Sequence, residues 1–182
     1  MANERVLLGI TGSAAAFKGV MLASLLRKEG FLVDGIITAA GLEFVSDTQL
    51  ACVTGRPVHT DLFTPQPGNP VPHITLTEDV QLLAVVPATA DFMARAACGL
   101  ADDLLSSVCL ACDAPVLMAP SMNTRMWNNR ATVRNAGLLR ERGVRFAGPV
   151  EGGLACGTSG VGRLMEPEEI MKAVLEILRG SD

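Results

Sequence analysis

The residues best suited to chemistry lie in a glycine-rich segment, residues 152–163. It reads GGLACGTSGVGR, with five glycines, a single thiol at Cys156 and a final cation at Arg163. Glycine loses more backbone entropy on ordering than other residues, so we expect a loop here and neither a helix nor an ordinary strand. A thiol and a guanidinium on such a loop indicate a flap over a small anionic substrate. A surface loop with an inert cysteine is the alternative.

Two further side chains suit catalysis. His73 follows a proline-rich segment, and histidine is the usual proton-transfer group near neutral pH. Asn123 follows an apolar run, and its amide both donates and accepts hydrogen bonds, which suits binding a carboxylate. Both also have structural interpretations, for Asn123 as a helix N-cap. The second histidine, His59, is expected to be structural or exposed.

The elements that must position these residues alternate along the chain. Short apolar runs predict strands at residues 6–10, 31–38, 80–86, 116–119 and 144–147. Helical spacing predicts helices at residues 14–29, 41–53, 90–98, 104–112, 128–142 and 167–178, and prolines make residues 56–72 a connection. Strands that are almost continuously apolar and alternate with helices indicate α/β architecture. We expect a single doubly wound, Rossmann-like and flavodoxin-like parallel sheet with helices on both faces.

Ligands of doubly wound folds bind at the carboxyl ends of the strands. Small and hydroxyl-bearing residues follow three predicted strands here: Gly12 and Ser13, then Thr38, then Ala88 and Thr89. Small residues permit close backbone approach, and hydroxyls beside helix N-termini bind phosphate. The pattern is neither GxGxxG nor a Walker loop, so it favours a mononucleotide over a dinucleotide cofactor. For the glycine–serine turn after the first strand, a plain helix cap is the alternative.

The composition excludes several classes of protein. A net charge of −4 and no basic run argue against a nucleic-acid partner. No apolar stretch reaches the ~18 to 20 residues of a membrane span, and the first residues predict a strand, not a signal peptide. Five scattered cysteines favour a reducing compartment, so we expect a cytoplasmic protein without a metal site, in which Cys109 and Cys112 belong to the core. A hydrophobic content of 49% suggests that ligand or other subunits cover some surface.

Five motifs, in register over essentially the whole chain, resemble the flavin-containing cysteine decarboxylases. This family includes phosphopantothenoylcysteine decarboxylase, the closest in pattern, and the peptidyl-cysteine decarboxylases of lantibiotic biosynthesis. The motifs that carry the resemblance are GITGSAAAFK and ITAAGLEF at the first two strand ends, PATADFMARAACGLADDLLSS in the centre, PSMNTRMW, and the flap GGLACGTSGVGR.

The resemblance implies FMN as the cofactor and gives individual residues roles. The implied catalytic residues are the base His73, the carboxylate holder Asn123 and the proton donor Cys156. The implied cofactor-binding residues are Gly12, Ser13, Thr38, Pro87, Ala88, Thr89, Ser106 and Met122. The implied substrate-binding residues are Asn123, Met126, Ala155, Cys156 and Arg163, the last a candidate to hold phosphate.

The implied reaction is the decarboxylation of 4'-phospho-N-pantothenoylcysteine to 4'-phosphopantetheine in coenzyme A biosynthesis. Oxidation of the cysteine thiol to a thioaldehyde by FMN would allow CO2 to leave, and Cys156 would supply a proton when FMNH2 reduces the resulting enethiol. One alternative is a peptidyl-cysteine decarboxylase that releases a C-terminal aminoenethiol. Others are a non-catalytic flavin-binding regulator and a prenyl-flavin synthase.

The resemblance also implies a homotrimer or a trimer-based homododecamer with FMN at subunit contacts. The expected unit is one decarboxylase domain, residues 1–182, with a substrate flap at about 151–165 and without the ligase domain that bacteria often fuse to it. Two positions depart from the family pattern. Thr158 stands where the flap commonly has an Asp, and Ser121 stands where Ala is frequent.

Overall fold

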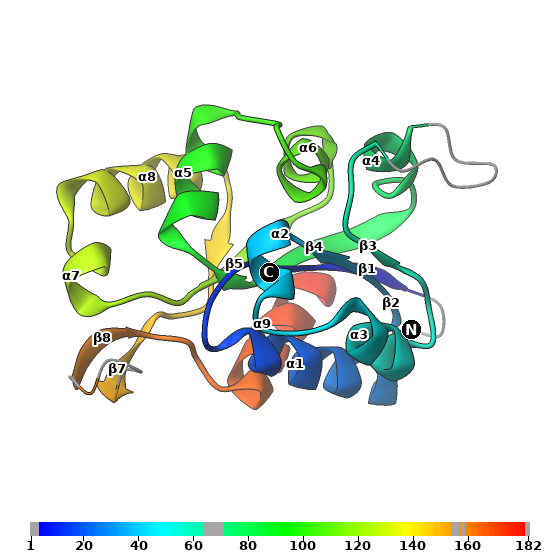
Figure 1. The fold of residues 1–182 in the computed structure, drawn as a ribbon, viewed down its shortest axis with the longest axis horizontal. Helices are drawn as coiled ribbons and strands as arrows, with labels where there is room; N and C mark the ends of the chain where they lie inside the picture. The colour runs from blue at the N-terminus through cyan, green and yellow to red at the C-terminus, as the bar shows by residue number, and fades with distance from the viewer. Residues whose placement is uncertain (1–3, 64–70, 154–156, 158, 181–182) are drawn as a thin grey trace.

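A six-stranded sheet forms the centre of the computed structural model, which describes residues 4–63, 71–153, 157 and 159–180 (Figure 1). The strands are β1 (Arg5–Ile10), β2 (Leu32–Ile37), β3 (Val58–His59), β4 (Val80–Ala88), β5 (Val116–Pro120) and β6 (Arg145–Phe146). They pair in parallel in the order β3-β2-β1-β4-β5-β6. The direction of winding reverses between β1 and β4, where such sheets bind ligands. The predicted doubly wound fold is therefore confirmed.

Helices cover both faces of the sheet (Figure 1). They are α1 (Ala16–Lys28), α2 (Ala39–Leu42), α3 (Asp47–Thr54), α4 (Pro72–Thr75), α5 (Ala90–Cys98), α6 (Leu104–Ala111), α7 (Thr124–Trp127), α8 (Arg130–Glu141) and α9 (Pro167–Leu178). Helix α1 packs against α3 and α9, whereas α5 packs against α6 and α8, and α4 against α6. Within β1, Val6 and Leu8 belong to the α1 and α9 core, and Leu7 belongs to the core of α5, α6 and α8. This alternation is the period of two that strand geometry imposes.

The predicted helix over residues 41–53 is wrong, because the chain forms two helices there. Thr38 caps α2 by accepting a hydrogen bond from the Gly41 N–H, and Ser46 caps α3 by accepting one from the Gln49 N–H. Serine and threonine compete for backbone N–H groups, which favours helix starts over helix interiors. The connection predicted at residues 56–72 likewise contains β3 and the first residue of α4.

The glycine-rich segment is not simply a loop, which corrects the expectation that strands are excluded there. Strands β7 (Val150–Gly153) and β8 (Ser159–Arg163) pair as an antiparallel hairpin. Glycine is required because a Cβ on Gly162 would lie 2.3 Å from the Met122 carbonyl oxygen, and one on Gly160 would lie 2.6 Å from Thr124 Oγ1. Close approach to the segment after β5 thus offsets the entropic cost of glycine. Ala155, Cys156 and Thr158 lie outside the described residues.

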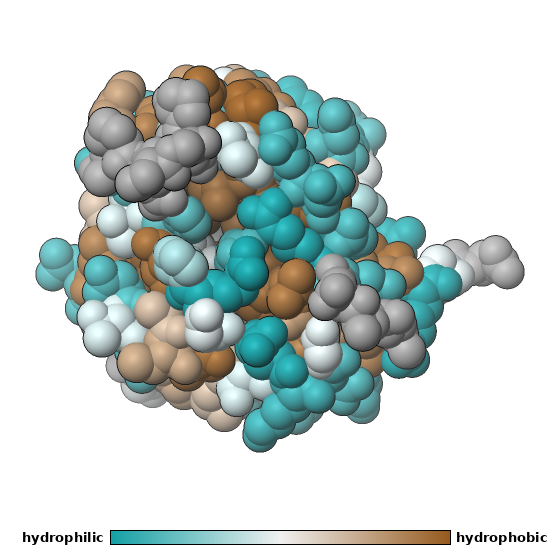
Figure 2. Space-filling model, turned by 90° about the vertical axis from the view of Figure 1, so that its right-hand side faces the viewer, coloured by the Kyte–Doolittle hydropathy of each residue, from teal (hydrophilic) through white to brown (hydrophobic). Residues whose placement is uncertain are grey.

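The surface is mixed in polarity. Hydrophilic and hydrophobic residues alternate over the face shown in Figure 2. Large exposed apolar side chains include Phe63, Val71 and Ile74 around α4, and Phe17 on α1. In the described ranges, no helix is long and apolar enough to cross a bilayer.

Candidate active site

A cavity of about 800 Å³ opens at the switch point of the sheet. The turn after β1 supplies Gly12 and Ser13 to its lining, the end of β2 supplies Thr38, and the end of β4 supplies Thr89. These are the three predicted strand ends, and parallel pairing brings them together. The volume lies in the range of about 300–1,000 Å³ that is usual for ligand pockets.

Local hydrogen bonds hold these hydroxyl groups in place. The Thr38 side chain accepts from the Gly41 N–H at 3.1 Å, and that of Thr89 accepts from the Phe92 N–H at 3.3 Å. Thr11 Oγ1 donates to the Pro87 carbonyl at 2.8 Å and accepts from the Thr89 N–H at 3.1 Å. Both threonines therefore cap helices, whereas the plain cap considered for the first turn is wrong, because the N-cap of α1 is Ala15, which makes no side-chain cap. Each cap also fixes a hydroxyl at the edge of the cavity.

Glycine is needed where the first turn meets α2. A Cβ on Gly12 would lie 2.6 Å from the Ala40 Cβ and 2.8 Å from its carbonyl oxygen. A larger residue would push the β1–α1 turn away from the end of β2. Gly12 thus allows the backbone to form one wall of the cavity.

The lining suits a phosphorylated molecule with a flat apolar body. Hydroxyl groups and the N-terminus of α5, which has nine residues, provide donors for a phosphate. Apolar side chains line the same cavity, namely Ile36, Ile37, Leu62, Leu104, Leu105, Met122 and Met126. The polar end of the cavity would donate hydrogen bonds to the phosphate of a mononucleotide, and the apolar part would stack against its ring system.

An ion-pair network forms the rim of the cavity. Arg95 on α5 contacts Asp91 at 2.7 Å and also Asp102, and all three line the cavity. The hydrogen bonds that Arg95 donates to Asp102 and Asp91 raise the pKa of Arg95, and the bond to Asp102 lowers the pKa of that carboxyl group. Arg95 and Asp102 therefore remain charged at neutral pH. The network ties α5 to the segment that precedes α6.

A second, smaller pocket of about 470 Å³ adjoins the cavity. The two share Ser13, Ser121 and Met122 in their linings, and the Ser13 and Ser121 hydroxyls are hydrogen bonded at 2.9 Å. The hairpin forms one side of the smaller pocket, because the Met122 N–H donates to the Gly162 carbonyl at 3.0 Å. The N-terminal part of α1, including Lys18, forms the other side.

Asn123 lies in the smaller pocket. Its Oδ1 accepts a hydrogen bond from the Arg125 N–H at 2.8 Å and so caps α7. The N-cap interpretation is confirmed. The cap also fixes the orientation of the amide next to the Met122 side chain that both pockets share.

The structure brings together most of the predicted site residues. The larger cavity collects Gly12, Ser13, Thr38, Thr89, Met122 and Met126, and the smaller pocket collects Ser13, Met122, Asn123 and Arg163. Pro87 and Ala88 do not line either pocket, although the Pro87 carbonyl holds Thr11. Ser106 lies outside both as well, because its buried hydroxyl bonds to Asp103 in the α6 capping box.

His73 is separated from the other predicted catalytic residues. It lies on α4, which packs against α6, and lines neither pocket of its own chain. Its Nδ1 is buried and has no hydrogen-bond partner among the described residues. Ala155 and Cys156 cannot be placed, because they fall outside the described ranges.

The two cysteines interpreted as core are half-buried near the end of α6. Burial raises the pKa of Cys109 to about 11 and raises that of Cys112. Both thiols are therefore protonated at neutral pH and poor nucleophiles. Within the described residues, no group of three or more acidic, histidine or cysteine side chains is placed to hold a metal ion.

Sequence reasoning missed Lys18 and the Arg95 network. Lys18 is a cation five residues after Ser13, in a helix whose other early residues are small or apolar. Such an isolated charge could have indicated a position beside the ligand. Asp91 and Arg95 have the spacing of a helical ion pair, but nothing in the sequence indicates Asp102 as a second partner.

The fold and the site define a Rossmann-like α/β protein with a large cavity at the strand ends and a smaller pocket that adjoins it. Residues 1–179 match the family model described as Flavoprotein, and the chain belongs to this family. The apolar part of the cavity lining suits a flat apolar ring system, and a flavin has one. The predicted family is thereby confirmed.

Curated relatives match the chain over nearly all of its length. Coenzyme A biosynthesis bifunctional protein CoaBC of Haemophilus influenzae is 41% identical over 172 residues, which are 94% of this chain and 43% of the relative. CoaBC of Mycobacterium tuberculosis is 41% identical over 179 residues, 98% of this chain and 42% of the relative. The chain thus spans less than half the length of these relatives.

Solved structures match in both chain length and fold. A mutant of PPC decarboxylase complexed with pantothenoylaminoethenethiol has a TM-score of 0.87 at 32% identity, covering 98% of this chain and 100% of that one. The FMN-dependent cysteine decarboxylase SpaF has a TM-score of 0.81 at 31% identity, covering 96% and 97%. Both are cysteine decarboxylases, as the motifs in the sequence indicate.

Proposed function

We propose that this chain is an FMN-dependent carboxy-lyase that converts 4'-phospho-N-pantothenoylcysteine to 4'-phosphopantetheine, a step of coenzyme A biosynthesis in the cytoplasm. The observation that carries the proposal is the junction of the two pockets at Ser13, Ser121 and Met122. A cofactor in the larger pocket would touch a substrate in the smaller one there. The CoaBC relatives and the PPC decarboxylase structure support this substrate.

The larger cavity would hold the FMN. Ser13, Thr38 and Thr89 would bind its phosphate through hydroxyl and backbone N–H groups, and Met122 would contact its ring. Pro87 and Ala88 would support the cavity wall without lining the cavity themselves. Ser106 would contribute indirectly, through the capping box of α6. FMN, when bound, supplies a two-electron acceptor for the cysteine thiol.

Asn123 would orient the substrate carboxylate. Its cap on α7 fixes the side chain beside Met122, so the carboxylate would be held at the junction of the two pockets. Orientation favours loss of CO2 when the breaking C–C bond is aligned with the developing C=S bond. Met126 and Arg163 would contact the remainder of the substrate, together with Ala155 and Cys156.

His73 would act from a neighbouring subunit. It lines neither pocket of its own chain, which favours a contact with the site of another copy. We propose a homotrimer, or four trimers in a dodecamer, in which α4 of one copy faces the cavity of the next. Exposed apolar residues beside His73, such as Ile74 and Val71, support burial against another copy.

The two electrons taken from the thiol would return to the enethiol from the reduced cofactor, and Cys156 would supply the proton. The alternative function, a peptidyl-cysteine decarboxylase, needs no such step because it releases the enethiol. The structural match to SpaF keeps this alternative open. Thr158, in place of an acidic residue, makes the flap less charged than is usual in the phosphopantothenoylcysteine branch.

The test is to incubate the flavin-loaded protein with phosphopantothenoylcysteine and, separately, with a peptide ending in cysteine. A mass loss of about 44 Da, for CO2 alone, is expected with the first substrate, whereas about 46 Da would indicate release of the enethiol. The C156S variant should change the first result into the second. No mass loss with either substrate would refute both enzyme functions.

The subunit arrangement is tested by complementation. The H73N and N123D variants should each be inactive. Mixed and reassembled, they should recover part of the activity, because some sites then combine an intact His73 with an intact Asn123 from another copy. No recovery from assemblies that contain both variants would contradict a shared site.

A further inference from the structure

We propose that Lys18 and Arg163 form an anion subsite in the smaller pocket, which binds the phosphate of the substrate and selects it over a peptide ending in cysteine. The inference rests on the proposed function. Lys18 is thereby a specificity-determining residue, and the smaller pocket prefers a substrate that carries a phosphate.

Two elements far apart in the sequence bring these cations together. Lys18 comes from the first turn of α1 and Arg163 from the last position of β8. Glu166 lies between them, with Lys18 Nζ at 2.9 Å from its Oε2 and Arg163 Nη2 at 3.3 Å from its Oε1. The shared carboxylate therefore links the α1 side of the pocket to the hairpin side and fixes both cations where the two sides meet.

The charge at this place is not balanced. The hydrogen bond from Lys18 lowers the pKa of Glu166, so the carboxylate is ionised at neutral pH. One negative charge thus faces two positive ones. Among the described residues that line the smaller pocket, the two charged side chains are both cations. A phosphate monoester, with a charge of about −1.5 to −2, would meet a positive field there.

Both cations also retain hydrogen-bonding capacity. Arg163 Nε is buried and has no hydrogen-bond partner among the described residues. Lys18 has only 14% of its side chain exposed, so water screens its charge weakly. A guanidinium and an ammonium group with partly buried charges are the donors that phosphate oxygens prefer.

The hairpin leaves room for this arrangement. A Cβ on Gly152 of β7 would lie 2.9 Å from Arg163 Nε. Glycine at this position therefore allows the guanidinium to lie across the hairpin. The same pocket contains Asn123. A substrate with a carboxylate at one end and a phosphate at the other would be recognised at both ends, whereas a peptide would lack the second contact.

The experiment compares 4'-phospho-N-pantothenoylcysteine with the same compound lacking its phosphate. The variants are K18M and R163M, which keep an apolar side chain of similar reach. Each should lower kcat/KM for the phosphorylated substrate about 10- to 100-fold, mainly through KM, the usual cost of losing a charged hydrogen bond. The loss should be much smaller for the dephosphorylated substrate, which lacks the group that the two cations would bind. R163K and K18R should recover part of the preference.

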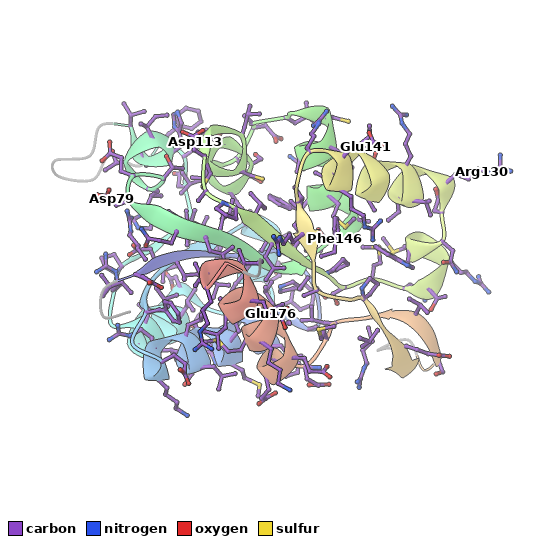
Figure 3. All side chains as sticks on the ribbon, turned by 180° about the vertical axis from the view of Figure 1, so that it is seen from behind. Asp79, Asp113, Arg130, Glu141, Phe146 and Glu176 are labelled. Atoms are coloured by element: carbon purple, nitrogen blue, oxygen red, sulfur yellow. The ribbon has the colours of Figure 1, made fainter. Side chains whose placement is uncertain are left out.

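Matched control variants are K28M, in the exposed last turn of α1, and R130M, which points outward at the start of α8 (Figure 3). Neither should alter the preference. Equal losses with both substrates would overturn the inference in favour of a structural role, and so would a wild-type protein without preference. If the wild-type protein turned over neither compound, the proposed function would fail. Calorimetric binding of 4'-phosphopantetheine against pantetheine would then test the subsite on its own: equal affinities would overturn it.

Discussion

Two carboxylates in this molecule each hold two cations, with different consequences. Asp34 on β2 pairs with Arg5 and Arg56, and Glu166 before α9 pairs with Lys18 and Arg163. The side chain of Asp34 is 4% exposed, whereas that of Glu166 is 42% exposed. The first cluster ties β1 and β2 to the segment before β3, and the second stands beside a pocket.

Both clusters contain one carboxylate and two cations, so their different effects on stability and ligand binding come from their location. Burial alone would raise the pKa of Asp34, but the hydrogen bonds and charges of Arg56 and Arg5 outweigh burial and lower it. An acid held in this way contributes to the stability of the fold. Glu166 is 42% exposed and can be solvated without its partners, so its ion pairs add little stability. Its cations remain available to a ligand.

Removal of the buried carboxylate should have the largest effect. D34N should lower the free energy of unfolding by about 2–3 kcal/mol, because Arg5 and Arg56 lose a common partner while remaining partly buried. The folded fraction should keep its substrate preference. Urea unfolding and kinetics would measure the two effects. The exposed E141Q serves as the control, and a D34N protein as stable as E141Q would contradict a structural role for this cluster.

Acid should destabilise the fold in two stages. Burial lowers the pKa of His59, which is buried near Asp34. The unfolded chain therefore binds the proton first, and stability falls as the pH drops below about 6.5. Asp34, whose pKa is also lowered, adds a second loss below about pH 4 as the carboxylate is protonated. Unfolding midpoints measured against pH should show both stages. H59Q should abolish the first, and an unchanged profile would contradict this assignment.

Replacement of the exposed carboxylate should cost little stability. E166Q should change the free energy of unfolding by less than about 1 kcal/mol, because exposed ion pairs are weak. A loss as large as that of D34N would remove the distinction between the two clusters. Thermal unfolding of both variants in one buffer provides the comparison.

The smallest expected effect is that of salt, which should weaken substrate binding at the Glu166 cluster and leave the stability provided by the Asp34 cluster almost unchanged. Between about 0.05 and about 0.5 M NaCl, KM for the phosphorylated substrate should rise severalfold, since screening weakens attraction to Lys18 and Arg163. The unfolding midpoint should hardly move, because the buried Asp34 cluster is screened less. A KM independent of salt would contradict electrostatic binding of the phosphate.

Much of the architecture could be predicted from local patterns. Continuous apolar runs indicated β1, β2, β4 and β5, and burial on both faces explains why those runs are continuous. The patterns failed where a short element depends on its neighbours. The strand β3 has two residues and pairs only with β2, so its sequence carries no period. The hairpin was missed because glycine has a low strand propensity. The glycines are needed there for close contact with Met122 and Thr124, which the sequence does not reveal.

The same division holds for the site. Small residues and hydroxyls after three strands indicated the cofactor cavity, because parallel strands place their carboxyl ends on one edge. The ion pairs of Lys18 with Glu166 and of Asp102 with Arg95 could not be predicted, because packing between elements brings these partners together. The remoteness of His73 was also invisible, because it depends on where α4 packs.

By itself, the sequence determined the family, the alternation of strands and helices and the strand ends that line the cavity. Those features follow from local composition and from motifs that keep their order along the chain. Only the tertiary structure decided that the glycine-rich segment is a hairpin, that two pockets meet at Ser13 and Ser121, and that Lys18 faces Arg163 across Glu166. These depend on distances between residues remote in sequence, which only packing sets.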